Sequence, residues 1–177
     1  MTAMKKSANN YAFIDGQNLY LGIQELGWKL DYKKFRTYLK EKYGIGKAYM
    51  FMGFLPSNQE LYNFLQTTGF VLVFKPIIAG RDTGKPVKGN VDAELVLQAM
   101  IDVRAYGKAV LVTGDGDFYC LVKYLDRQSK LERVLAPSMA HCSSLLTKIA
   151  GKKMAFVNDL RHKLEYKRKE PHEDETS

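Results

Sequence analysis

Short apolar runs alternate with segments of helical spacing along most of the chain, and this alternation restricts the fold more than any other feature. Tyr11–Ile14 and Ala109–Val112 are near-continuous apolar runs of the length expected for buried strands. Tyr32–Tyr43 instead carries apolar residues at helical spacing after Asp31, a suitable N-cap. Alternating strands and helices favour a doubly wound α/β domain with helices on both faces of a mostly parallel sheet.

The same criteria predict the remaining elements. Further strands are expected at 48–55, 70–78, 132–135 and 154–157. Further helices are expected at 18–26, 58–68, 91–103 and 118–127, from Ser143 or Ser144 to Gly151, and from Asn158 or Asp159 onwards. We therefore expect one domain at 11–166, preceded by a flexible N-terminus at 1–10 and followed by a disordered charged tail at 167–177.

The charge balance of the 177-residue chain points to polyanionic partners. It has 27 Lys and Arg against 19 Asp and Glu, a formal net charge of +8. Such a surface attracts nucleic acid, although many soluble proteins carry similar charge for solubility alone. No apolar run approaches membrane-spanning length, and the N-terminus lacks the apolar core of a signal peptide, so we expect a cytoplasmic protein with no membrane partner.

Several kinds of site are not expected. Cys120 and Cys142 are the only cysteines, with no short spacing between them, so neither a zinc site nor a disulfide framework is predicted. His141 adjoins Cys142, but one such pair supplies too few ligands for structural zinc. The glycine-rich fingerprints that cradle nucleotide phosphates are missing, so no nucleotide cofactor is expected.

Three short acidic motifs follow apolar runs or open an apolar helix. They are Phe13–Asn18, Gly89–Asp92 and Val112–Asp117. In an open parallel sheet, ligands bind outside the carboxyl ends of the strands, so segments distant in sequence can meet in one crevice. Neighbouring carboxylates repel one another unless a cation neutralises them, and oxygen ligands favour Mg²⁺ or Mn²⁺. We therefore predict a metal site formed by Asp15, Asp92, Asp115 and Asp117.

Each motif also has a simpler interpretation. Asp15 could belong to an ordinary turn, and Asp92 could be a helix-start residue favoured by the helix dipole. The pair Asp115 and Asp117 is harder to explain this way, because two carboxylates just after a buried strand would repel without a partner. Asn18 would lie near Asp15, where it could hold a metal-bound water or the carboxylate itself. Glu94 is expected to be a solvated first-turn charge rather than a ligand.

A basic segment precedes the second acidic motif. Residues 79–90 contain three glycines and little apolar content, which predicts a loop. We define its cations, Arg81, Lys85 and Lys88, as the basic segment. They are candidates for binding a nucleic-acid backbone, although a solvated loop explains each of them equally well.

Taken together, the three motifs resemble those of NYN domains of the LabA-like group, in the PIN-like nuclease superfamily. The resemblance rests on Phe13–Asn18, Lys88–Leu95 and Val112–Phe118, and it spans the chain from Tyr11 to about Leu160. It implies a PIN-like three-layer sandwich, a mostly parallel sheet between helices, with divalent metal bound at the strand ends. By similarity, the acidic positions are Asp15, Asp92, Asp115 and Asp117, and Asn18 takes the polar position after the first aspartate. Gly116 departs from the serine usual in this family.

The resemblance implies a metal-dependent endoribonuclease that acts on RNA, or on single-stranded DNA, with Mg²⁺ or Mn²⁺ as cofactor. One alternative is a non-catalytic NYN module that binds RNA or a protein, because fold does not imply function. Another is a small-molecule phosphohydrolase, which would have a closed pocket in place of an open groove. The sequence leaves the oligomeric state open, a homodimer included.

Overall fold

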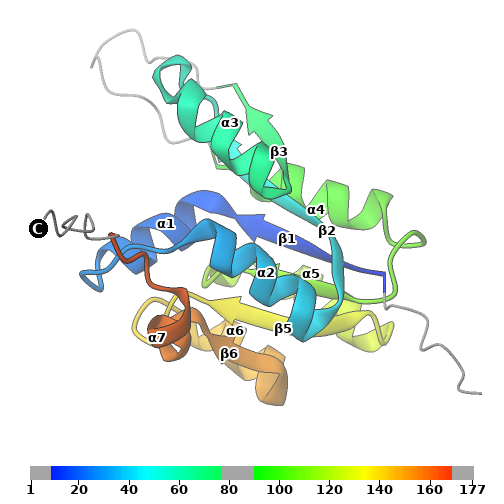
Figure 1. Ribbon diagram of the computed structural model, residues 1–177. Helices are drawn as coiled ribbons and strands as arrows, with labels where there is room; N and C mark the ends of the chain where they lie inside the picture. The colour runs from blue at the N-terminus through cyan, green and yellow to red at the C-terminus, as the bar shows by residue number, and fades with distance from the viewer. Residues whose placement is uncertain (1–8, 77–89, 169–177) are drawn as a thin grey trace, which may run out of the picture.

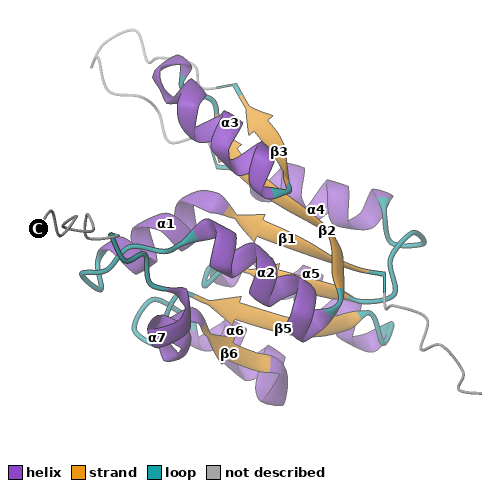
Figure 2. Ribbon diagram, in the orientation of Figure 1, coloured by secondary structure: helices purple, strands orange, loops and turns teal. Residues whose placement is uncertain are grey.

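A six-stranded sheet forms the centre of the computed structural model, which describes residues 9–76 and 90–168. Every neighbouring pair of strands is parallel, and the strand order is β3-β2-β1-β4-β5-β6 (Figures 1 and 2). The strands are β1 (Asn10–Asp15), β2 (Ile45–Gly53), β3 (Phe70–Lys75), β4 (Ala109–Val112), β5 (Leu131–Ala136) and β6 (Met154–Phe156).

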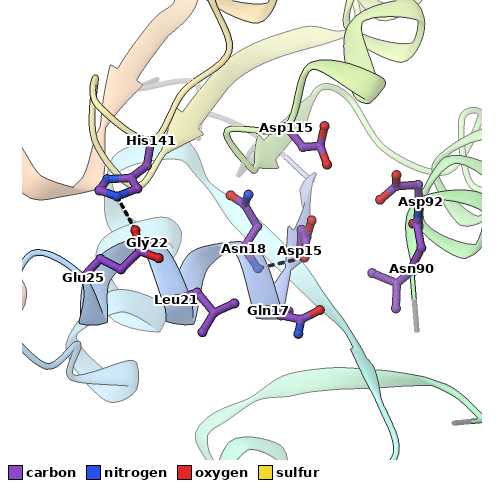
Figure 3. A pocket seen from close by; sticks show the side chains of 11 residues that line it. Asp15, Gln17, Asn18, Leu21, Gly22, Glu25, Asn90, Asp92, Asp115 and His141 are labelled. Atoms are coloured by element: carbon purple, nitrogen blue, oxygen red, sulfur yellow. Dashed lines mark hydrogen bonds and ion pairs between the residues drawn. The ribbon is translucent and has the colours of Figure 1, made fainter. Parts of the chain in front are cut away.

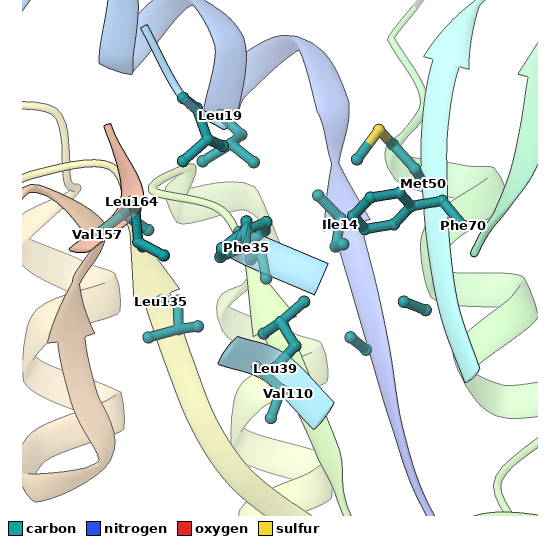
Figure 4. Close-up of a cluster of buried hydrophobic side chains, with 14 of the residues drawn as sticks. Ile14, Leu19, Phe35, Leu39, Met50, Phe70, Val110, Leu135, Val157 and Leu164 are labelled. Carbon is teal, nitrogen blue, oxygen red and sulfur yellow. The ribbon is translucent and has the colours of Figure 1, made fainter. Parts of the chain in front are cut away.

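Helices cover both faces of the sheet and produce three layers. One face carries α1 (Gly16–Gln24), α2 (Tyr32–Tyr43), α3 (Gln59–Thr68) and α7 (Arg161–Leu164), and the other carries α4 (Asp92–Ile101), α5 (Tyr119–Arg127) and α6 (Ser144–Ala150). The central strand β1 divides its side chains between the two faces. Ala12 and Ile14 join the core beneath α1 and α2, seen in Figure 4, while Tyr11 and Phe13 join the core beneath α4 and α5. This architecture confirms the predicted PIN-like sandwich.

Local signals place several element boundaries. The side chain of Asp31 accepts hydrogen bonds from the backbone amides of Lys33 and Lys34, so α2 begins at Tyr32 as predicted. Gly44 and Gly69 end α2 and α3 in the left-handed conformation that glycine adopts without strain.

Other boundaries differ from the sequence prediction. β2 begins at Ile45, three residues before the predicted start at 48. The helix predicted at 91–103 is shorter, at Asp92–Ile101. The predicted terminal helix is a 3₁₀ turn, Val157–Leu160, followed by the single-turn α7. No helix among the described residues has the length and apolar character needed to cross a membrane.

The order of the strands determines where a site can form. The chain builds β1, β2 and β3 outward in one direction and then returns to place β4 on the other side of β1. The carboxyl ends of β1 and β4 are therefore adjacent at the point where the strand order reverses. In doubly wound sheets this is the crevice in which ligands bind. Asp15 is the last residue of β1, and Asp115 follows β4 closely.

Candidate metal centre

Three of the four predicted carboxylates form a compact cluster. Asp92, Asp115 and Asp117 each offer an oxygen atom, and these atoms all lie within 4.8 Å of one another. Asp92 is the first residue of α4, whereas Asp115 and Asp117 belong to the turn after β4. Hydrogen bonds hold this turn in place. The Asp115 carboxylate accepts from the Asp117 amide at 2.9 Å, and the Asp115 amide donates to Thr113 Oγ1 at 3.1 Å.

Asp15 lies in the same cleft but outside that cluster of three. Its side chain is only 6% exposed, and it caps α1 by accepting a hydrogen bond from the Asn18 amide at 3.1 Å. The pKa of Asp15 is raised to about 6, chiefly by burial and also by the charges of Asp92 and Asp115, while backbone hydrogen bonds from Asn18 and Gln17 oppose the rise. The Asp15 charge is therefore costly in the metal-free protein.

The pKa of Asp92 is also raised. Burial raises the pKa of its carboxyl, and the neighbouring charges of Asp115 and Asp117 add to this effect. A hydrogen bond with Asn90 and the charge of Lys75 oppose the increase without cancelling it. An all-oxygen donor set whose members repel one another fits a hard divalent cation such as Mg²⁺ or Mn²⁺.

The side chain of Asn18 makes a contact that the sequence did not predict. Its side-chain oxygen accepts a hydrogen bond from the Gly114 amide at 2.8 Å. This bond ties the first turn of α1 to the acidic turn after β4. Asn18 therefore positions the two segments that carry Asp15 and Asp115, and its side-chain oxygen is already engaged by the protein.

Asp15, Asp92 and Asp115 line one part of a cleft with a volume of about 390 Å³. One face of α1 forms its wall, at positions separated by three or four residues: Asn18, Leu21, Gly22 and Glu25. His141 and Glu25 close the far end (Figure 3), where the imidazole Nε2 lies 2.5 Å from a Glu25 oxygen. His141 Nδ1 lies 2.9 Å from the hydroxyl of Ser138. No spacing or motif in the sequence predicts this pair.

Two glycines let the loop between β5 and α6 close against the acidic turn. A Cβ atom at Gly114 would lie 2.0 Å from the backbone oxygen of His141. A Cβ atom at Gly116 would lie 2.5 Å from the hydroxyl oxygen of Ser143, which caps α6. The departure from the family serine at position 116 therefore has a physical reason, because Ser143 occupies the space that a side chain there would enter.

Lys75 brings a cation to the rim of the cleft. It donates a hydrogen bond to the backbone oxygen of Asn90, and its ammonium nitrogen lies 3.5 Å from a carboxylate oxygen of Glu94. Glu94 is thus a half-buried partner of Lys75 rather than the solvated charge that the sequence suggested. The basic segment, Arg81, Lys85 and Lys88, lies outside the described residues, so its role in binding stays a prediction.

Comparison with known proteins identifies the family. The NYN domain model matches residues 11–151, which is most of the chain. The chain belongs to the NYN family. It is 29% identical over 122 residues to the low amplitude and bright protein LabA of Synechococcus elongatus, which confirms the LabA-like group. This alignment covers 64% of the NYN chain and 65% of LabA, so the chain spans slightly less than two thirds of that relative's length.

A solved structure supports the fold. A protein of unknown function from Vibrio parahaemolyticus has a crystal structure similar to that of this NYN chain, with a TM-score of 0.75 at 23% identity. The match covers 92% of this chain and 99% of the other. At this identity the similarity concerns the fold alone. NYN domains are nuclease-like, and the aspartate cluster described above lies at the carboxyl edge of the sheet.

Proposed function

We propose that this NYN domain is a metal-dependent endoribonuclease that hydrolyses phosphodiester bonds of RNA with Mg²⁺ or Mn²⁺. The observation that carries the proposal is the cluster of Asp92, Asp115 and Asp117, with oxygens within 4.8 Å of one another, beside buried Asp15. Carboxylates brought together in this way destabilise the fold unless they serve a cation. The open cleft along α1 suits a polymer better than the closed pocket of a small-molecule phosphohydrolase.

The carboxylates would divide the work. Asp92, Asp115 and Asp117 would hold the cation, which supplies charge stabilisation at the phosphate and lowers the pKa of bound water. Asp15 faces the same cleft from the end of β1 and would orient the attacking water. Asn18 keeps the two strand ends in register through its bond to Gly114. The basic segment and the net charge of +8 would attract the RNA backbone.

Cleavage assays test this function directly. Labelled RNA and single-stranded DNA are incubated with the purified protein in Mn²⁺, Mg²⁺ or EDTA, and products are resolved on a gel. We expect RNA cleavage with either metal and none in EDTA. Asp115→Asn should reduce the rate at least about a hundredfold, because charge stabilisation at the phosphate supplies a barrier reduction of this order.

Asp31→Asn is the matched control. Asp31 also caps a helix, but it lies at the start of α2 and belongs to no carboxylate cluster. It should retain full activity. Cleavage that survives EDTA, or an Asp115→Asn protein as active as the control, would contradict the proposal. RNA binding without cleavage in any metal would favour the non-catalytic module instead.

A further inference from the structure

A second cavity lies on the opposite side of α1 from the carboxylate cleft. Its volume is about 330 Å³. It lies between α1, the α1–α2 connection and the start of α2, and its walls are Tyr20, Ile23, Gln24, Trp28, Lys29, Leu30 and Tyr32. Neither the aspartate chemistry nor the family motifs account for this concentration of aromatic side chains.

The cavity has an apolar floor and a polar, aromatic rim. Ile23, Trp28 and Leu30 are buried, at 2%, 7% and 6% exposure. Tyr20 stands at the rim with 53% of its surface exposed. Gln24 and Lys29 are also exposed and line the cavity, and the Lys29 ammonium nitrogen lies 5.3 Å from the centroid of the Tyr166 ring.

The second tyrosine of the cavity packs against the hydrophobic core. Tyr32 packs edge-on against Phe70, with ring centroids 6.3 Å apart. Burial, with a contribution from Tyr20, raises the pKa of Tyr32 to about 12. Its phenol is therefore neutral at every working pH, so this wall carries no negative charge that would repel a polyanion.

These walls match the requirements of a nucleobase. Proteins bind unstacked bases by stacking them on aromatic side chains and hydrogen-bonding their edges, and they neutralise the adjoining phosphate with cations. Tyr20 and Tyr32 offer the aromatic rings, Gln24 an amide that can both donate and accept, and Lys29 the cation. The volume lies within the range of about 300–1,000 Å³ that is usual for small ligands.

The position of the cavity connects it with the carboxylate cleft. Asn18, Leu21 and Gly22 line the cleft, whereas Tyr20, Ile23 and Gln24 line the second cavity, so only the width of α1 separates the two. A helix with its side chains is about 10–12 Å across, which is roughly three stacked nucleotides at about 3.4 Å each. In Figure 1, α1 extends beyond the carboxyl end of β1, where a single-stranded nucleic acid could cross this helix.

We propose that the aromatic cavity binds one unstacked base of a single-stranded RNA whose backbone continues over α1 into the carboxylate cleft. This inference rests on the proposed function for the identity of the polymer. It adds a binding subsite that anchors the strand a few nucleotides away from the bond that is cut.

The cavity contains its own reporter. Trp28 is the single tryptophan of the chain and lines the cavity, so intrinsic tryptophan fluorescence reports on changes around this one side chain. The parent protein is titrated with a short single-stranded oligoadenylate RNA and, separately, with AMP, both in EDTA so that no cleavage occurs. We expect the RNA to change Trp28 emission with saturation, and AMP to bind at least tenfold more weakly because it lacks the continuing backbone.

Substitutions identify the surface that binds. Tyr20→Ala should weaken RNA binding by about 5- to 100-fold, the loss expected for one base–aromatic stack, and Tyr20→Phe should restore most of it. Tyr20 is half exposed, so its truncation leaves no cavity in the core. Tyr124→Ala removes a comparably exposed tyrosine, 43% accessible, from α5 on the opposite face of the sheet, and it should change nothing.

The outcomes separate this inference from the proposed function. If Trp28 emission does not respond to RNA, or if Tyr20→Ala binds as tightly as Tyr124→Ala, the base subsite is wrong. If AMP binds as tightly as the oligonucleotide, the proposed path of the backbone over α1 is wrong. If emission responds as expected and yet no metal supports cleavage, only the nuclease activity is refuted.

Discussion

Replacing Asp15 with asparagine should stabilise the metal-free protein at neutral pH, contrary to the usual effect of mutating a buried residue. Asp15 is 6% exposed, and burial raises its pKa from 3.8 to about 6. A difference of about two pKa units corresponds to a penalty of about 3 kcal/mol for ionising this group in the folded state. Asparagine removes the charge and keeps a side-chain oxygen that can still accept the Asn18 amide hydrogen bond.

The gain should depend on pH in a defined direction. Between pH 3.8 and about 6 the folded protein holds a proton on Asp15 that the unfolded chain has released, so stability falls as the pH rises through this window. Above about pH 6 the folded protein bears the full cost of ionising Asp15. Asp15→Asn should therefore gain up to about 3 kcal/mol at pH 7.5 and almost nothing at pH 4.

Urea unfolding in EDTA at both pH values measures the difference. Thermal melts give the same comparison, with about 2–4 °C per kcal/mol for a domain of this size. Asp31→Asn is the control. Asp31 also caps a helix, but it is not a member of the carboxylate cluster among the described residues. An Asp15→Asn protein that is less stable than the parent by the same amount at both pH values would refute the reasoning. It would mean that hydrogen bonds to the carboxylate outweigh its burial.

Three further predictions concern metal binding, RNA binding and the acidic turn after β4. Millimolar Mn²⁺ should raise the melting temperature of the parent by mass action, and Asp115→Asn should reduce this shift; an unchanged parent melting curve would argue against a metal site. Replacing the three cations of the basic segment with alanine in an Asp115→Asn background should weaken RNA binding at all sequences and flatten its salt dependence, as measured by affinity against salt concentration. Gly114→Ala should cost about 1–3 kcal/mol in urea unfolding and remove the Mn²⁺ stabilisation, because its Cβ would meet the His141 backbone 2.0 Å away; the full metal effect in that variant would show that the acidic turn tolerates the shift.

The parts of the fold that depend on local chemistry were predictable from sequence. The bounds of α2 follow from an aspartate that caps its first turn and a glycine in the left-handed conformation after its last. The acidic positions were predictable because parallel strands end at one edge, so that Asp15 and Asp115 meet although about a hundred residues separate them.

The side-chain pairs around the cleft were not predictable. His141 reaches Glu25 from a loop with no periodic pattern, and the pairing requires the close approach that Gly22 allows, where a Cβ would lie 2.6 Å from Pro137. Lys75 pairs with Glu94 from the end of an edge strand. Such contacts depend on how separate elements pack, and no spacing within either segment records them.

The identity of residue 15 is itself an argument for a role beyond folding. The structural task at this position is to cap α1, and asparagine would perform it as well as aspartate. Aspartate adds a charge that burial and two acidic neighbours penalise. Natural proteins retain such a cost where activity needs it, because selection acts on function once stability is sufficient. A divalent cation bound in the cleft would turn the repulsion among Asp15, Asp92 and Asp115 into attraction toward a shared charge, which explains the position without any further assumption about the fold.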